Sequence, residues 1–157
     1  MTPAEIREHV GRLDTTSVHQ EQEAWEHLRD LGVAVVPYLA EAYRSCRKWQ
    51  GRVSLVFHCI RYARVSDDAF RLGLEALSDK STHVRYRACG LLAYSRRTEA
   101  IPHLRPLLQY SDLRTVEDAR AAIDAITHQN HHYFVDRDHS GRSRWQVNEG
   151  DVVQPGR

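Results

Sequence analysis

The stretch Val84-Arg-Tyr-Arg-Ala88-Cys-Gly-Leu91-Leu92 decides the fold, because its apolar side chains recur every three or four residues. That spacing places them in one stripe along an α-helix. Similar segments start at Ala24, Val56 and Ala119, so the four equivalent positions, with Ala88, follow one another at steps of 32, 32 and 31 residues. A period of this length predicts stacked helical units.

A second set of segments lies between the first and predicts that each unit holds two helices. Val36-Pro37-Tyr38-Leu39 and Ile101-Pro102-His103-Leu104 have the same form, with their prolines two steps apart. Proline is typical of the first turn of a helix, and Ser17 and Ser66 stand where N-caps are needed. We expect helices at about 3–13, 17–31, 35–46, 49–64, 67–78, 82–95, 99–109 and 114–127.

The segment Asp79-Lys-Ser-Thr-His-Val-Arg85-x-x-Ala88, continued by Leu91-Leu92 and Ala100-Ile-Pro-x-Leu104, resembles a short bacterial HEAT-like repeat. This repeat occurs in phycobilisome lyase-type proteins. The resemblance covers 79–126 well and 17–78 less closely, because Arg52-Val53 and Glu21 replace the Val-Arg pattern there. It implies that the second helix of each pair lines a concave surface. It also implies a role like that of small HEAT-like immunity and adaptor proteins, which bind and sequester a partner protein.

The predicted fold class is all-α. One helix pair of about 30 residues cannot bury its apolar stripe alone, so neighbouring pairs must cover it. We predict a short α-solenoid of about four HEAT-like helical hairpins over 1–130. A β-hairpin at 131–147 would cap it, because aromatic and β-branched stretches flank a turn at Gly141. We expect 148–157 to be a frayed tail.

Composition excludes several other classes of protein. The 157 residues are 41% hydrophobic, which suits one domain with a core of its own. The net charge of +1 favours neither nucleic acid nor an anionic membrane. The three cysteines are an odd number without a C-x-x-C pair, which argues against a disulfide framework. No signal peptide or membrane span is evident, so we expect a cytoplasmic protein.

The polar side of the second helices suggests a binding surface. The central units present Tyr and Arg, which often carry the binding energy of protein interfaces, and the outer units present carboxylates. We therefore expect a non-enzymatic module that binds another protein, without a cofactor or catalytic residue. The expected partner-binding residues are Glu23, Glu26, His58, Arg61, Tyr62, Tyr86, Arg87, Tyr94 and Asp124.

Two alternatives remain open. The first is a HEAT-like protein that binds nucleic acid, although carboxylates such as Glu23 and Glu26 on the expected groove oppose phosphate contacts. The second is a lyase or a metal-dependent enzyme that uses a C-terminal His/Asp cluster. The enzyme would be built around His131, His132, Asp136 and Asp138, and His128 and His139 lie in the same cluster.

We nevertheless expect no metal site in this cluster. The spacing of His128, His131 and His132 is not one that structural zinc sites use, and no cysteine is near. The run Asp136-x-Asp138-x-Ser140-Gly141 imitates the start of an EF-hand loop, but its twelfth position is Val147 and not a glutamate. The cysteines are expected to be reduced packing residues.

Overall fold

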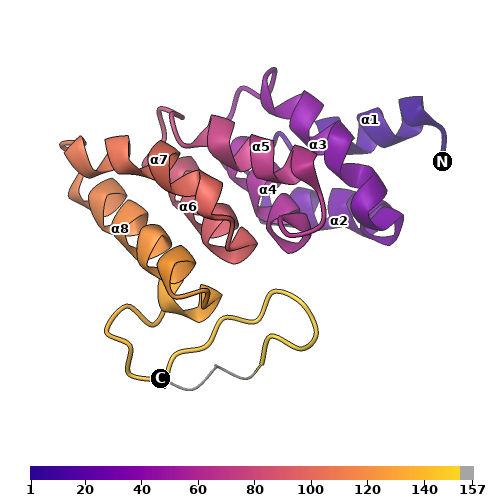
Figure 1. The fold of residues 1–157 in the computed structure, drawn as a ribbon. Helices are drawn as coiled ribbons and strands as arrows, with labels where there is room; N and C mark the ends of the chain where they lie inside the picture. The colour runs from indigo at the N-terminus through magenta and orange to yellow at the C-terminus, as the bar shows by residue number, and fades with distance from the viewer. Residues whose placement is uncertain (153–157) are drawn as a thin grey trace.

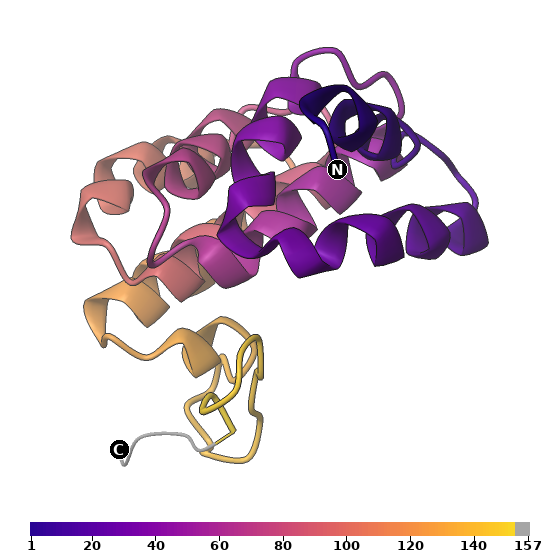
Figure 2. The same ribbon diagram turned by 90° about the vertical axis from the view of Figure 1, so that its right-hand side faces the viewer.

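The computed structural model describes residues 1–152 of the chain, in which eight α-helices form two layers (Figure 1). The first helices of the four pairs form one layer and the second helices form the other. Figure 2 shows the pairs stacked one behind the next. The helices are α1 (Pro3–Gly11), α2 (Val18–Leu28), α3 (Val36–Tyr43), α4 (Trp49–Cys59), α5 (Asp67–Ala76), α6 (Thr82–Ser95), α7 (Ile101–Leu104) and α8 (Leu113–Thr127).

Short 3-10 segments extend or join these helices, and local sequence signals set their ends. Ser17 Oγ accepts the N–H of Gln20, and Ser66 Oγ accepts the N–H of Ala69, as the capping pattern predicted. Gly32 has φ +60°, which lets the chain turn from α2 into α3. The 3-10 segments are η1 (Arg29–Val35), η2 (Ile60–Tyr62), η3 (Thr98–Ala100), η4 (Arg105–Gln109) and η5 (His131–Phe134).

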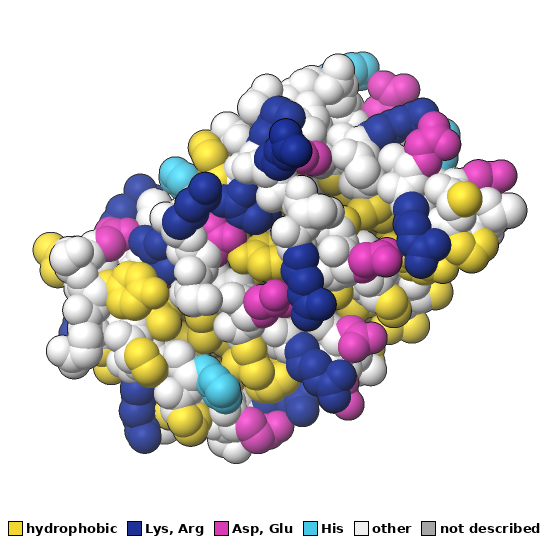
Figure 3. All heavy atoms as spheres, turned by 90° about the horizontal axis from the view of Figure 1, so that it is seen from above, with side chains coloured by type: hydrophobic (Ala, Val, Ile, Leu, Met, Phe, Trp, Pro, Cys, Tyr) yellow, Lys and Arg dark blue, Asp and Glu magenta, His cyan; other side chains and the backbone are white. Residues whose placement is uncertain are grey.

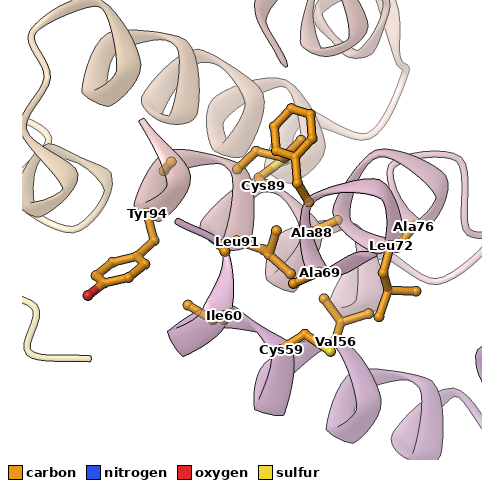
Figure 4. Close-up of a cluster of buried hydrophobic side chains, with 14 of the residues drawn as sticks. Val56, Cys59, Ile60, Ala69, Leu72, Ala76, Ala88, Cys89, Leu91 and Tyr94 are labelled. Carbon is orange, nitrogen blue, oxygen red and sulfur yellow. The ribbon is translucent and has the colours of Figure 1, made fainter. Parts of the chain in front are cut away.

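The core lies between the two layers and is continuous from one pair to the next (Figure 4). Helix α6 occupies its centre, packing against α4, α5 and α8. Leu91 and Leu92 are fully buried there. Burial raises the pKa of Cys59 to about 12 and also raises that of Cys89, so both are protonated packing residues. The predicted α-solenoid of four HEAT-like hairpins is confirmed.

Two equivalent Arg–Asp ion pairs, which we call the ion-pair ladder, join successive helix pairs, and the repeat pattern did not predict them. Arg52 donates two hydrogen bonds to Asp79, with Nε–Oδ2 at 2.8 Å and Nη2–Oδ1 at 3.2 Å. One unit later, Arg85 donates to Asp112 at 3.0 Å. The arginines lie 33 residues apart, and so do the aspartates. Each arginine also donates to a backbone carbonyl before its own helix, which fixes the loop at that joint.

The predicted β-hairpin is wrong, because no strand forms within residues 1–152. Residues 131–134 form η5, and the chain then continues as coil beneath α6 and α8 (Figure 1). Side chains take the place of a strand ladder: Asp136 accepts the N–H groups of Ser140 and Gly141, and His132 Nδ1 accepts the N–H of Trp145. These local bonds compete with strand pairing for the same backbone groups.

The start of the expected frayed tail is anchored. Asp151 is buried and accepts the hydroxyl of Tyr94 at 2.7 Å, and Asn148 donates to the carbonyl of Arg61 at 2.9 Å. The remaining tail, 153–157, lies outside the described residues. Among the described helices, none is both long and apolar enough to cross a bilayer.

Candidate metal centre

Two histidines and one aspartate converge at the C-terminal end of α8. Asp124 Oδ2 lies 2.5 Å from His139 Nε2, and Asp124 Oδ1 lies 3.1 Å from His128 Nδ1. One ligand atom from each residue lies within 4.8 Å of the others. Two imidazoles and one carboxylate are a donor set used by catalytic zinc sites and by non-haem iron sites. The three residues therefore fit a divalent transition-metal ion.

The local fold explains this convergence. Asp124 and His128 are one helical turn apart on α8, so their side chains share one face. The chain then turns through Gln129 and η5 and returns at His139, whose φ of +56° is uncommon for a residue other than glycine. The ring of His139 stacks on Tyr133 with centroids 3.8 Å apart, which holds the imidazole towards Asp124.

A cavity of about 490 Å³ opens beside the three ligands and is bordered by Asp124 and His139 themselves. Two arginines and Glu117 also line it. Arg137 is held by Asp118, with Nη2–Oδ1 at 3.0 Å, while Arg120 makes no ion pair with any residue in 1–152. Burial raises the pKa of Asp118, although the hydrogen bond from Arg137 opposes this effect. Side chains of the centre are 29–50% exposed, so solutes reach it from the cavity.

The structure divides the His/Asp cluster that we considered from the sequence. Its buried half is structural: His131 lies between Arg64 and the carbonyl of Trp145, at 3.1 Å and 2.8 Å. Desolvation lowers the pKa of His131 to about 4, so its imidazole is neutral at pH 7. Asp136 is 1% exposed and accepts the hydroxyl of Ser140 at 2.7 Å, which holds the following loop. Only His128 and His139 of that cluster join the metal centre.

One predicted tyrosine anchor of the concave interface, Tyr94, is corrected. Tyr94 is 2% exposed and its hydroxyl is bound to Asp151, because the C-terminal coil covers this side of α6. Tyr86 is half-buried against Phe134, and Tyr62 is packed on the core. Tyr94 is therefore closed off from a partner, whereas Tyr62 and Tyr86 keep part of their surface exposed.

The other predicted residues are spread over the molecule. Glu23 lines a cavity of about 590 Å³ near α1, and Glu26 is exposed on α2. His58 stacks on Trp25 with centroids 3.6 Å apart. On the face formed by α3, α5 and α7, Lys and Arg side chains alternate with Asp and Glu (Figure 3). That face carries no extended area of a single charge.

Sequence reasoning missed the metal centre because its ligands come from two kinds of element. The spacing of Asp124 and His128 is a visible signal, since residues four apart share a helix face. The contribution of His139 depends on the path of the loop after η5. Asp136 fixes that path, and neither periodicity nor spacing reveals it.

The chain is thus an α-solenoid of HEAT-like hairpins with a candidate metal centre at its last helix. No protein-family model matches the sequence, and no curated protein matches it. Among solved structures, it is similar to human deoxyhypusine hydroxylase in complex with glycerol, with a TM-score of 0.65 and 14% sequence identity. The match covers 96% of this chain and 50% of that one, so this chain spans half the length of the hydroxylase.

This similarity overturns the main functional expectation from the sequence. We expected a non-enzymatic binding module and no enzyme, but the same fold occurs in a hydroxylase. The error arose because repeat periodicity specifies how helices stack and carries no information on chemistry. Tyr94, one of the tyrosines that supported the interface, is also buried, which weakens the structural argument for that interpretation.

Proposed function

We propose that this protein is a metal-dependent enzyme whose metal ion is held by Asp124, His128 and His139. The observation that carries the proposal is the convergence of these three side chains beside the arginine-lined cavity. A divalent ion with an open coordination position supplies Lewis-acid activation of a bound substrate or water. The similarity to a hydroxylase supports an enzyme on this fold and makes iron one of the ions to test.

The chain's own residues have separate roles in this proposal. Tyr133 orients His139 by stacking, and η5 buries Tyr133 against α8. Arg120 and Arg137 line the approach and would hold an anionic group of the substrate next to the metal. Asp118 keeps Arg137 in place through its hydrogen bond. An ion at the centre would replace the direct contacts between Asp124 and the two imidazoles.

Metal titration tests the proposal. Isothermal titration calorimetry with Zn²⁺, Mn²⁺ and, under anaerobic conditions, Fe²⁺ should show one ion per chain. His139→Asn should weaken the affinity at least 10-fold, because it removes one of three ligands. The matched control is His19→Asn. His19 also faces a carboxylate four residues away, Glu23 at 3.8 Å, but has no third ligand nearby.

Turnover is then measured with the loaded protein. The Zn²⁺ form is assayed with p-nitrophenyl phosphate and p-nitrophenyl acetate, and the Fe²⁺ form is assayed for oxygen consumption with ascorbate. We expect metal-dependent turnover in one assay, abolished by His139→Asn and retained in His19→Asn. A protein that binds no ion at micromolar concentration, or binds one and turns over none of these substrates, refutes the proposal.

A further inference from the structure

Another cavity shares no lining residue with the cavity beside the metal ligands and has a different chemistry. It has a volume of about 340 Å³ and lies where the C-terminal coil passes the ends of α2 and α4. We call it the aromatic slot. Trp25, Phe57, His58, Arg61 and Trp145 line it, together with the chain at 146–147. A volume of this size suits a small molecule.

Flat rings form most of the slot. The indole of Trp25 stacks on the imidazole of His58 at 3.6 Å, and the ring of Phe57 meets the same imidazole edge-on at 5.2 Å. Phe57 is 47% exposed, although a phenylalanine gains free energy when it is covered. Trp145 adds a second indole from the C-terminal coil. Aromatic walls of this kind bind planar apolar molecules.

The charge of the slot is positive. Neither Arg61 in the slot nor Arg87 beside it forms an ion pair with any residue in the described part of the chain, and Arg87 lies 4.9 Å above the ring of Phe57. Glu21 lines the adjoining cavity, but it already accepts Ser54 Oγ at 2.8 Å and contacts His58 Nε2 at 2.6 Å. Two unpaired guanidinium groups therefore complement an anionic group at the edge of a ring.

The wall contributed by the C-terminal coil is held in place from outside the slot. The backbone N–H of Trp145 donates to His132 Nδ1 at 2.8 Å, and the backbone carbonyl of Trp145 lies 2.8 Å from His131 Nε2. Asn148 donates to the carbonyl of Arg61, which joins the coil to η2. Because these bonds order the wall in advance, this part of the protein would lose little conformational entropy when a ligand binds.

We propose that the aromatic slot binds a planar aromatic molecule that carries an anionic group, such as an aromatic carboxylate. The ring contacts Trp25, Phe57 and Trp145, and the anionic group pairs with the guanidinium of Arg61. This site is separate from the metal centre, and its ligand does not depend on bound metal.

The experiment uses 2-naphthoate as the probe, with EDTA present so that the result is independent of the metal centre. Its neutral amide and 2-naphthylmethylammonium are the two comparison probes. In ¹H–¹⁵N spectra of the full chain, 2-naphthoate should shift the indole N–H signals of Trp25 and Trp145. It should leave Trp49 unchanged, because that indole stacks on His83 outside the slot. Single Trp→Phe variants assign the three signals.

Affinity then tests the charge. Arg61→Gln should weaken 2-naphthoate binding about 10-fold, which corresponds to the loss of one charge-assisted hydrogen bond. Arg105→Gln is the matched control, since Arg105 is exposed on η4 and also unpaired among the described residues. Three results overturn the proposal: no shift at millimolar probe, equal binding of all three naphthalenes, or equal weakening in the two arginine variants.

Discussion

Removal of the Asp79 carboxylate should destabilise the fold far more than removal of an exposed carboxylate one turn away. Asp79 accepts two hydrogen bonds from Arg52, one from the hydroxyl of Tyr43 at 2.6 Å and one from the N–H of Ser81 at 2.9 Å. The side chains of Arg52 and Asp79 are only 9% and 5% exposed. Asp79→Ala therefore leaves a buried guanidinium without its counter-charge.

The magnitude follows from this burial. Breaking a buried pair by removing one partner costs about 3–5 kcal/mol, whereas an exposed pair contributes about 0–1 kcal/mol. Glu75 supplies the matched control, because it pairs with Arg44 at 3.2 Å with side chains 40% and 77% exposed. We expect Asp79→Ala to lower the free energy of unfolding by about 3–5 kcal/mol and Glu75→Ala by less than about 1 kcal/mol.

Urea unfolding followed by far-ultraviolet circular dichroism measures both values, with unchanged m-values as the check on two-state behaviour. Asp79→Asn keeps the shape of the side chain and gives a folded reference if the alanine variant does not fold. Equal losses in Asp79→Ala and Glu75→Ala would refute the argument that the ladder stabilises the joints between helix pairs.

The same site also gives a pH dependence. Burial raises the pKa of Asp79, but the hydrogen bonds from Arg52, Tyr43 and Ser81 outweigh it and leave the pKa below its usual value. The carboxylate therefore contributes stability that is present above about pH 4 and is lost as the pH falls through the lowered pKa. Between pH 5 and pH 3, the free energy of unfolding should fall less in Asp79→Asn than in the wild type. The difference between the two falls should be on the order of 1 kcal/mol.

Three further changes have expected outcomes. The wild type should also lose stability as the pH falls from about 6.5 towards 4, because His131 has a lowered pKa and the unfolded chain takes up the proton first; urea unfolding of His131→Gln should show a smaller loss. Gly51→Ala should lower the free energy of unfolding by about 1–3 kcal/mol, because the added Cβ would lie 2.8 Å from the backbone of Asp14. Gly11→Ala is the control and should not destabilise the fold, because open space surrounds Gly11. Thermal unfolding compares the two variants. The three cysteines should react slowly with Ellman's reagent at pH 7 in the folded protein and quickly in urea, and fast reaction without urea would contradict their raised pKa values.

Much of the fold could be predicted from the sequence because each unit repeats the same packing problem. The apolar stripe around Ala88 recurs at nearly constant steps, and caps such as Ser17 and Ser66 mark helix starts within a few residues. The ion-pair ladder is also visible in the sequence, as Arg52 and Arg85 are spaced like Asp79 and Asp112. It was missed because the two members of each pair lie 27 residues apart.

The C-terminal region could not be predicted in the same way. Its aromatic and β-branched residues suit a strand, but Asp136 and His132 bind the backbone groups that a strand ladder would need. The coil that results covers Tyr94 and brings His139 to Asp124. The same local hydrogen bonds thus bury Tyr94, which was predicted to bind a partner, and bring together the residues of the candidate metal centre, which was not predicted.

The ladder makes the array extensible. The same sequence separation of 27 residues between Arg and Asp recurs at two consecutive joints. A duplicated block of 33 residues inserted between α6 and α8 would therefore bring its own arginine and aspartate. It could form one Arg–Asp pair with the unit before it and one with the unit after it. Lengthened versions of this chain should therefore assemble without redesign of the seams, and their resistance to denaturant should grow with each added block.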